Sequence, residues 1–179
     1  MDQESLLRNA MGQYGDAVYR LALCRLQNQA DAEDVYQEVF LRLLREPEQD
    51  WEPEHLKAWL LRTALHRCAD VGRFRLRWKI VPLDAASELA RPEKAEAAEL
   101  WDAVGRLPEK LRTVVHLYFG EGYRTEEIAC MVGVPSATVR TRLHRAKRKL
   151  KDLLGGIEDD GEEQLSEHAG GYPYPGRAQ

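Results

Sequence analysis

The spacing of apolar residues predicts helix along most of the chain. Near the N-terminus apolar side chains recur at steps of three and four positions, the period of one helical face: Leu6, Leu7, Met11, Tyr14, Val18 and Leu21. A second helix is expected from Asp31 or Ala32 to about Arg45, because carboxylates in its first turn suit the helix dipole. Pro47 and Pro53 then bracket a loop. No stretch alternates apolar and polar residues as a strand would, so the fold class is all-α.

Two further segments complete this first block. A third helix is expected from about Pro53 to beyond Asp70, with Trp59 at a position more typical of a core side chain. Residues 80–100 have the composition of a linker that passes into a helix near Ala95.

A second helical block follows the linker. Pro108 is tolerated in the first turn of a helix, and the glycines at 120 and 122 are expected to end that helix. Thr125 is a candidate N-cap of a short helix with two acids behind it, and Gly133 fits the C-terminal turn of that helix. Ser136 is expected to cap the last long helix.

The last helix combines one apolar stripe with a basic remainder. The stripe has steps of four, three and four residues: Val139, Leu143, Ala146 and Leu150. Residues 136–151 hold seven Lys or Arg and no carboxylate. After a short helix and a tight turn, this pattern is typical of a helix-turn-helix whose second helix enters a major groove, although a solvated basic face is the alternative. Arg140 and Thr141 are best placed for base edges, and Arg145, Lys147 and Arg148 for phosphates.

Net charge hides this organisation, since 26 Lys and Arg are set against 30 Asp and Glu over the 179 residues. Residues 62–79 hold six basic residues and one acid, and residues 107–154 hold ten and five, while the connector and the last 25 residues are acidic. Two separate basic surfaces indicate a polyanionic partner.

One polar face lies outside these basic patches. Asp34, Gln37 and Glu38 share one side of the second helix, and Asp31 extends it into an acidic patch. Spacing alone does not distinguish a binding surface from an ordinary solvated face.

Composition excludes several classes of protein. No apolar run has the roughly 18 residues of a membrane span, and the first ten residues lack the features of a signal peptide. The three cysteines have no paired spacing and are expected to be small buried side chains in reduced cytosol. No phosphate loop, nucleophilic constellation or His/Cys ligand spacing is present, so we expect neither an enzyme nor a cofactor or metal site.

Three motifs together resemble one known family. The segment DAEDVYQEVFLRLL resembles region 2.2 of an extracytoplasmic-function (ECF) sigma factor, and AWLLRTALHRCADVGR resembles regions 2.3 and 2.4. The segment LPEKLRTVVHLYFGEGYRTEEIACMVGVPSATVRTRLHRAKRKLKDLL is similar to region 4. The resemblance implies a region 2 helical bundle over residues 1–79, an acidic linker over 80–100, a region 4 helix-turn-helix over 101–154 and an acidic, disordered tail over 155–179.

The resemblance implies a cytoplasmic bacterial transcription initiation factor, with no membrane insertion, that binds core RNA polymerase and promoter DNA. By similarity, core polymerase would be bound by Asp34, Gln37 and Glu38. The −10 element would be bound by Arg62, Thr63, His66, Arg67 and Arg73. The −35 element would be bound by Ser136, Arg140, Thr141, His144, Arg145, Lys147 and Arg148. An anti-sigma factor is the further partner that the family implies.

Some positions stay open. Many family members have Asn where this chain has the bulkier, titratable His66, so no −10 sequence is carried over from relatives. Trp78, among basic residues, either packs on DNA or closes its domain. A stand-alone helix-turn-helix regulator would bind duplex DNA tightly without polymerase. A pure interaction protein, whose basic helix binds an acidic partner, would show little salt-dependent binding to DNA of any sequence.

Overall fold

The computed structural model describes residues 2–47, 50–78 and 95–155, with backbone alone for residues 95–98. The elements follow one another in the order α1 (Gln3–Leu26), α2 (Gln29–Leu43), α3 (Pro53–Trp78), α4 (Ala95–Gly105), α5 (Glu109–Val115), the π-helical turn η1 (His116–Gly120), α6 (Thr125–Val132) and α7 (Ser136–Leu153). The described residues contain no strand, and the expected all-α fold is confirmed. The predicted linker up to residue 94 and the tail from residue 156 lie outside the described residues.

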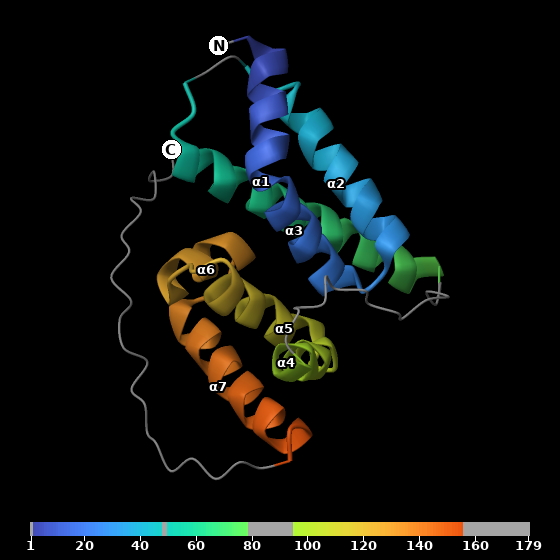
Figure 1. The fold of residues 1–179 in the computed structure, drawn as a ribbon, viewed down its shortest axis with the longest axis vertical. Coiled ribbons are helices and arrows are strands. Elements are labelled where there is room, and N and C mark those ends of the chain that lie inside the picture. The colour runs from blue at the N-terminus through green and yellow to red at the C-terminus, as the bar shows by residue number, and fades with distance from the viewer. Residues whose placement is uncertain (1, 48–49, 79–94, 156–179) are drawn as a thin grey trace.

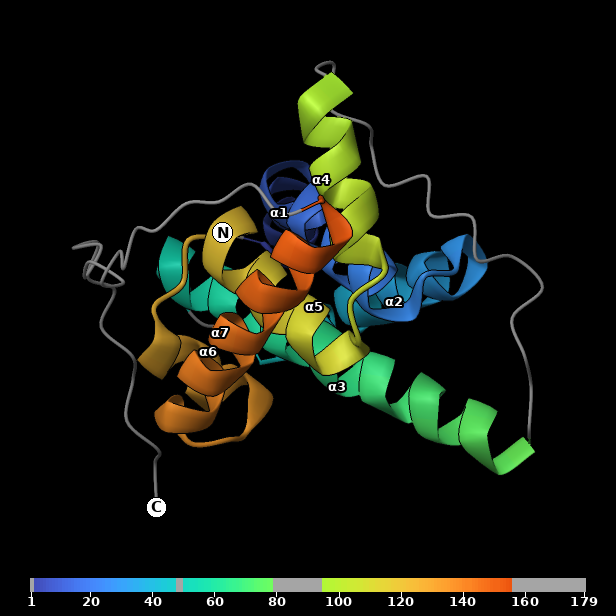
Figure 2. The same ribbon diagram turned by 90° about the horizontal axis from the view of Figure 1, so that it is seen from below.

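Helices α1, α2 and α3 form one bundle, called here the first unit (Figure 1). The apolar stripes predicted from the sequence meet inside it, where Val18, Val35, Val39 and Leu60 are fully buried. The C-terminal end of α3 extends beyond the rest of the bundle (Figure 2). This unit therefore presents the outer faces of α2 and α3 on a packed three-helix core.

Helices α4 to α7 form the second unit, in which α7 packs across α4, α5 and α6. Val114 of α5, Ile128 of α6 and Val139 of α7 are fully buried between them. Helix α7 lies along the outside of the unit, so its other faces point away from the packed helices (Figure 1). The second unit is thus a platform that holds α7 by one face.

Helix boundaries differ from the predictions by a few residues, for local reasons. Helix α2 begins at Gln29, before the expected Asp31, because the Asn28 side chain accepts a hydrogen bond from the Asp31 N–H at 2.9 Å and caps the helix. Thr125 and Ser136 are first helical residues and not N-caps, since the caps are the residues before them.

The helix that starts after Pro108 also ends in an unexpected way. Its last turn, η1, is π-helical, and the Glu121 N–H donates to His116 O at 3.1 Å. The chain then turns at Gly122, whose φ of 75° is open to glycine without strain. This turn carries Glu121 and Tyr123 toward the first unit.

The two units pack directly against each other. Helix α1 contacts α5 and η1, and α3 contacts α6, so that buried apolar side chains of both units form one cluster. The sequence indicated two domains joined by a linker and gave no sign of this contact. The arrangement of the units is therefore a finding of the structure.

Candidate nucleic-acid interface

The turn between α6 and α7 has the geometry that the glycine pattern predicts. Gly133 has a φ of 72°, in the left-handed region, and its N–H donates to Ala129 O at 2.9 Å. The Val134 N–H donates to the same carbonyl at 3.1 Å, and Pro135 precedes α7. This arrangement ends α6 at Val132 and begins α7 at Ser136 after a tight turn, as in a helix-turn-helix.

Helix α7 is held by one stripe and is exposed elsewhere. Val139 and Ala146 are fully buried and Leu143 is nearly so, as predicted. Ser136 is partly exposed at the start of the helix. The other predicted −35 residues are exposed: Arg140, Thr141, His144, Arg145, Lys147 and Arg148. The side chains that would reach DNA therefore lie on the outer face of α7.

Two of these side chains have partners within the second unit. Arg140 forms an ion pair of 2.6 Å with Glu126 of α6, and both side chains are more than half exposed. The pKa of Glu126 is lowered by a hydrogen bond from its own N–H, by the Thr125 hydroxyl and by Arg140. The Thr141 hydroxyl donates to Ala137 O at 2.9 Å. An exposed ion pair of this kind contributes little stability, so Arg140 can exchange Glu126 for a base or phosphate.

The residues predicted to bind the −10 element differ in exposure. His66 and Arg73 are exposed on α3 and Arg67 is half-buried, whereas Thr63 is only 5% exposed. Arg62 is partly buried and lines a cavity of about 640 Å³. Three of the five side chains thus lie on an open surface, and Thr63 does not.

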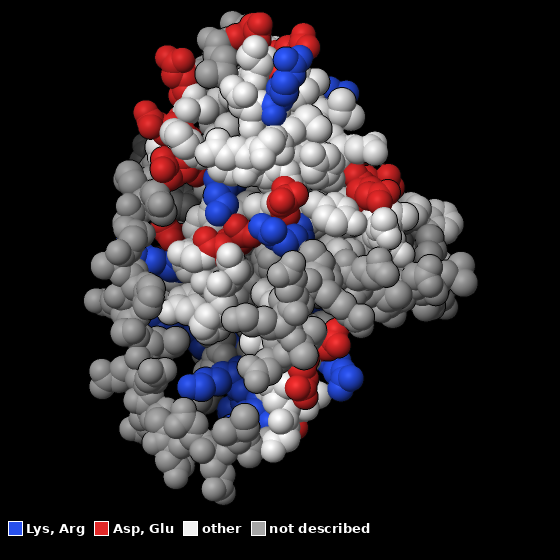
Figure 3. Space-filling view, in the orientation of Figure 1, with Lys and Arg blue, Asp and Glu red and all other residues white. Residues whose placement is uncertain are grey.

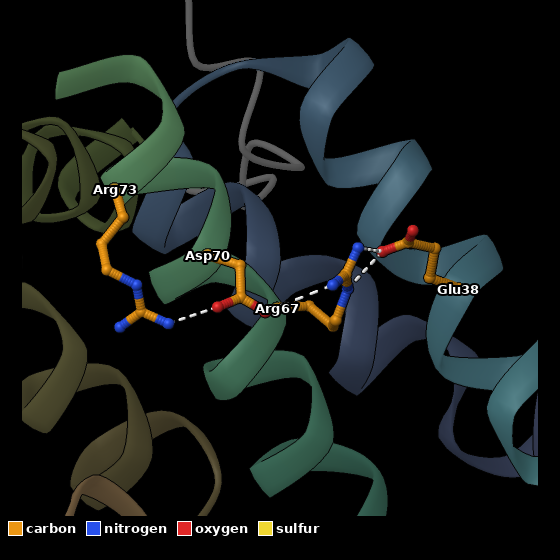
Figure 4. A network of polar contacts seen from close by, with 4 residues as sticks. All are labelled: Glu38, Arg67, Asp70 and Arg73. Atoms are coloured by element: carbon orange, nitrogen blue, oxygen red, sulfur yellow. Dashed lines mark hydrogen bonds and ion pairs between the residues drawn. The ribbon is translucent and has the colours of Figure 1, made fainter. Parts of the chain in front are cut away.

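The polar face of α2 lies next to this surface. Asp34, Gln37 and Glu38 are all exposed, as their spacing predicts. Glu38 forms an ion pair with Arg67 of α3, which also contacts Asp70 at 3.2 Å (Figure 4). The hydrogen bond that Arg67 donates to the Glu38 carboxylate is the main reason that the pKa of Arg67 is raised.

The chain of charges continues along α3, because Asp70 also pairs with Arg73 (Figure 4). Asp31, which the sequence placed in the acidic patch, pairs with Arg75. A predicted polymerase contact and two predicted DNA contacts therefore belong to one ion-pair network in this state. The network joins positions 29 residues apart, which local spacing does not reveal.

The cavity beside Arg62 lies where the two units meet. The first unit contributes Trp51, Lys57 and Trp59, and the second contributes Glu121 and Tyr123. The rings of Trp51 and Trp59 are 5.6 Å apart between centroids, so Trp59 is part of an aromatic pair at the cavity wall. Charged side chains of both signs lie close together on the face where the upper and lower helices meet (Figure 3).

Sequence reasoning missed the polar residues that join the units, above all Arg112, Lys57, His116 and Glu121. Arg112 is only 5% exposed, and its guanidinium donates to carbonyls of both units. The one signal in the sequence is an arginine within the apolar run of α5. The sequence contained no indication of its partners.

Trp78 and the three cysteines have defined positions in the structure. Trp78 is 63% exposed and lies near Phe74, at 6.2 Å between ring centroids, so it does not close the described part of its unit. Cys24 and Cys68 are buried as expected, and burial raises the pKa of their thiols to about 11 and about 12. Cys130 is exposed, and the expectation of burial was wrong there because it lies on the outer face of short helix α6.

Within the described ranges, no three His, Cys, Asp or Glu side chains are grouped so that they could hold a metal ion. None of the helices in the same ranges combines the length and the apolar character that a membrane crossing needs.

Comparison with known proteins agrees with the two units. The Sigma-70 region 2 family matches residues 10–79, and the Sigma-70, region 4 family matches residues 97–150. The chain is 37% identical to the ECF RNA polymerase sigma factor SigE of Mycolicibacterium smegmatis over 79% of this chain and 59% of the relative. It is 30% identical to the ECF RNA polymerase sigma factor SigM of Mycobacterium tuberculosis over 77% of this chain and 71% of the relative.

Solved structures show the same fold. The sigma factor RpoE of Bartonella quintana, in complex with the anti-sigma factor NepR, matches with a TM-score of 0.70 and 20% identity over 82% of this chain and 95% of that chain. CnrH, in complex with the cytosolic domain of CnrY, matches with a TM-score of 0.58 and 25% identity over 84% and 88%. The chain therefore spans somewhat more than half of SigE and most of SigM, and it belongs to the ECF group of the sigma-70 family of RNA polymerase sigma factors.

Proposed function

We propose that the protein binds core RNA polymerase through the first unit and directs it to promoters through α3 and α7. The observation that supports this most strongly is that region 2 and region 4 match the two units in this order. The proposed division of labour is region 2 over residues 1–79, the linker over 80–100, region 4 over 101–154 and the tail over 155–179. The protein recognises polymerase and DNA and catalyses no reaction in this proposal, and it acts in the cytoplasm.

Core polymerase binds the outer face of α2 in this proposal. Asp34, Gln37 and Glu38 are exposed on that face and offer a carboxylate-rich surface to a basic partner. Binding there would compete with Arg67 for Glu38, because the two side chains are paired in the free protein.

The −10 element binds along α3. His66 and Arg73 are exposed, and Arg67 lies between them. Unpaired bases captured by such a surface offset the cost of strand separation, a few kcal/mol, so that opening needs no nucleotide hydrolysis. Contact at Arg62, which lines the cavity, and at the buried Thr63 requires that α3 become more accessible than it is here.

The −35 element binds α7 in the major groove. Arg140, Thr141 and His144 lie in the first half of the helix, where side chains reach base edges in a helix-turn-helix. The later Arg145, Lys147 and Arg148 contact phosphates, which makes the affinity strongly dependent on salt. An anti-sigma factor is a further proposed partner, as in the RpoE complex.

The test is transcription by purified core polymerase from a related host on genomic DNA, with sequencing of the transcripts that start. We expect new start sites that share two spaced upstream motifs, and we expect them to disappear when Asp34→Ala and Gln37→Ala are combined. The matched control is Gln29→Ala with Glu33→Ala, an exposed glutamine and acid on the same helix that bond to each other. Duplex binding without new start sites would instead identify a stand-alone regulator.

A further inference from the structure

We propose that the C-terminal end of α3 is a binding site for single-stranded DNA, in which Phe74 and Trp78 stack on unpaired bases and Arg77 neutralises a phosphate beside them. The inference deepens the proposed function and rests on it, because it gives the separated strand a second contact that does not depend on sequence. Phe74, Arg77 and Trp78 lie outside the set of residues expected to bind the −10 element.

Two aromatic rings are exposed near the end of α3. Phe74 is 57% exposed and Trp78 is 63% exposed, whereas Phe40 in the core of the same unit is 3% exposed. The two exposed rings are four residues apart and share one side of the helix, with their centroids 6.2 Å apart and their planes at 46°. Exposed apolar side chains that gather in this way are typical of a binding surface.

The exposure of these rings follows from the length of α3. The C-terminal end of this helix, which runs from Pro53 to Trp78, extends beyond the rest of the bundle (Figure 2). Arg75 ties the last turns to the bundle, since it pairs with Asp31 of α2 and donates to Leu26 O at 3.4 Å. The end of α3 is therefore held on one side by the bundle and exposed on its other sides.

Basic side chains lie beside the rings. Residues 71–79 contain four basic residues and no acid. Arg77 is exposed and comes three residues after Phe74, so the two side chains are neighbours on the helix surface. Arg73 lies on the same side of the helix as Arg77, and its side chain is 72% exposed although it pairs with Asp70. The surface is thus complementary to a polyanion that also presents flat apolar faces.

Single-stranded DNA fits this chemistry better than a duplex does. In a duplex the faces of each base are covered by the base pairs above and below it. In an unpaired strand the bases can stack on aromatic rings while the phosphates meet the cations, and this stacking tolerates any sequence. An acidic peptide would satisfy the arginines without accounting for the exposed rings.

The site is continuous with the proposed −10 surface. His66 is exposed on the same helix, and Arg67 and Arg73 lie between it and the rings. At 1.5 Å per residue, His66 and Trp78 are separated by about 18 Å along α3. A strand whose bases are unpaired near His66 can therefore continue along the same helix to Phe74 and Trp78, where stacking opposes its return to the duplex.

The test measures binding of the full chain to a fluorescein-labelled oligothymidylate by fluorescence anisotropy. An excess of unlabelled duplex is present, because the basic face of α7 binds the phosphates of any strand. We expect Phe74→Leu and Trp78→Leu, called here the ring variants, each to weaken binding about fivefold or more, the lower end of the loss expected for one base–aromatic stack. Leucine is apolar and favours helix but has no ring.

The arginine should give a different signature in the dependence of affinity on salt. Arg77→Gln should weaken binding and lower the slope of log affinity against log salt concentration by about 0.7, the change for one phosphate contact on a single strand. The ring variants should keep the slope of the parent, because they remove no charge. Circular dichroism establishes that each variant retains its helices.

Two matched controls are present in the same chain. Phe119→Leu removes a ring of the second unit that is 71% exposed, and Leu76→Ala shortens a side chain that is 82% exposed on another side of α3. Neither control should change the affinity for the oligothymidylate by more than about twofold. No binding by the parent, or equal affinities in the parent and the ring variants, would overturn the proposal. Sedimentation of the ring variants would then show whether the rings pack against a second copy of the chain.

The outcomes separate this inference from the proposed function. If the parent chain yields no promoter-specific transcripts with core polymerase but the ring variants lose affinity for the oligothymidylate, the proposed function fails and the stacking site remains. If transcription is promoter-specific but the ring variants bind the oligothymidylate as the parent does, the stacking site fails and the proposed function remains.

Discussion

Arg112 is a buried cation whose guanidinium donates to four backbone carbonyls, those of Cys24, Arg25, Gly105 and Leu107. Replacing it with methionine keeps most of the volume but removes these donors. We expect Arg112→Met to lower the free energy of unfolding by about 2–4 kcal/mol, because buried carbonyls lose their partners. Urea denaturation measures the change.

The matched control for that change is Arg106→Met, at an exposed position just before α5. Its effect should stay within about 0.5 kcal/mol, as for most surface substitutions. Equal effects of the two substitutions would show that the carbonyl contacts of Arg112 contribute nothing to stability.

Glu121 makes the stability of the folded protein sensitive to acid. Burial alone would raise its pKa, but hydrogen bonds and charge from His116 and Lys57 lower it to about 2. A carboxyl group with a lowered pKa stabilises the folded state above its ordinary pKa of 4.5, and that contribution is lost as the pH falls toward 2. The stability difference between the parent and Glu121→Gln, measured by denaturation at several pH values, should therefore shrink between about pH 4.5 and pH 2.

The exposed residues of the site could be predicted from sequence, because helical periodicity alone decides which side of a helix faces the core. Asp34 and Arg145 lie outside as expected, opposite the buried Val35 and Leu143. The pairing of Glu38 with Arg67 could not be predicted, because it depends on how two helices cross. Thr63 is buried with Leu60 and Ala64 on the packed side of α3, and it was the family resemblance, not the periodicity, that predicted a DNA contact for it.

At the scale of elements, the turn between α6 and α7 depends on one backbone conformation. Gly133 has a φ of 72°, and a Cβ added there would meet no atom within 4 Å, so strain alone opposes a side chain. We expect Gly133→Ala to destabilise the protein by about 1 kcal/mol and to weaken −35 binding by tilting α7. Thermal unfolding and duplex binding at fixed salt measure the two effects.

Gly12→Ala is the control for that substitution. Gly12 lies inside α1, where an added Cβ also meets no atom within 4 Å and the backbone is helical. Alanine should stabilise the protein there by about 0.5–1 kcal/mol, because glycine loses more conformational entropy in a helix. Effects of the same sign at the two glycines would contradict the role assigned to Gly133.

The helices themselves were predictable, while their ends and the π-helical turn were not. Apolar stripes extend over several turns, so the cores of α1, α3 and α7 follow from periodicity. Ends depend on single hydrogen bonds, such as the one from the Asp31 N–H to Asn28. The π-helical turn His116–Gly120 begins at a buried imidazole, and no local apolar pattern encodes either feature.

At the scale of the molecule, the sequence indicated two domains and the structure adds their contact. The residues that make it are separated by more than 60 positions along the chain, as Lys57 and Glu121 are. Charge patterning suggested surfaces that face a polyanion, and α7 agrees with that. The same patterning could not show that an arginine and a glutamate of region 4 face the protein's own region 2.

The thiols offer a direct report on this contact in the unmodified chain. Cys24 lies at the interface, with its sulfur 3.9 Å from Arg112 O, and burial raises its pKa to about 11, whereas Cys130 is exposed. Because the thiolate is the reactive form, a thiol reagent should label Cys130 rapidly and Cys24 slowly. Labelling followed by peptide mass spectrometry measures both rates at once.

Separation of the two units should change only the labelling rate of Cys24. In Lys57→Glu we expect faster labelling of Cys24 and an unchanged rate at Cys130, because separation removes α5 from the end of α1. Lys110→Glu, the same change at an exposed position of α5, is the control and should leave both rates as in the parent. If the labelling rate of Cys24 is the same in all three proteins, the burial of Cys24 depends on the first unit alone. The Lys57–Glu121 ion pair would then not hold the two units together.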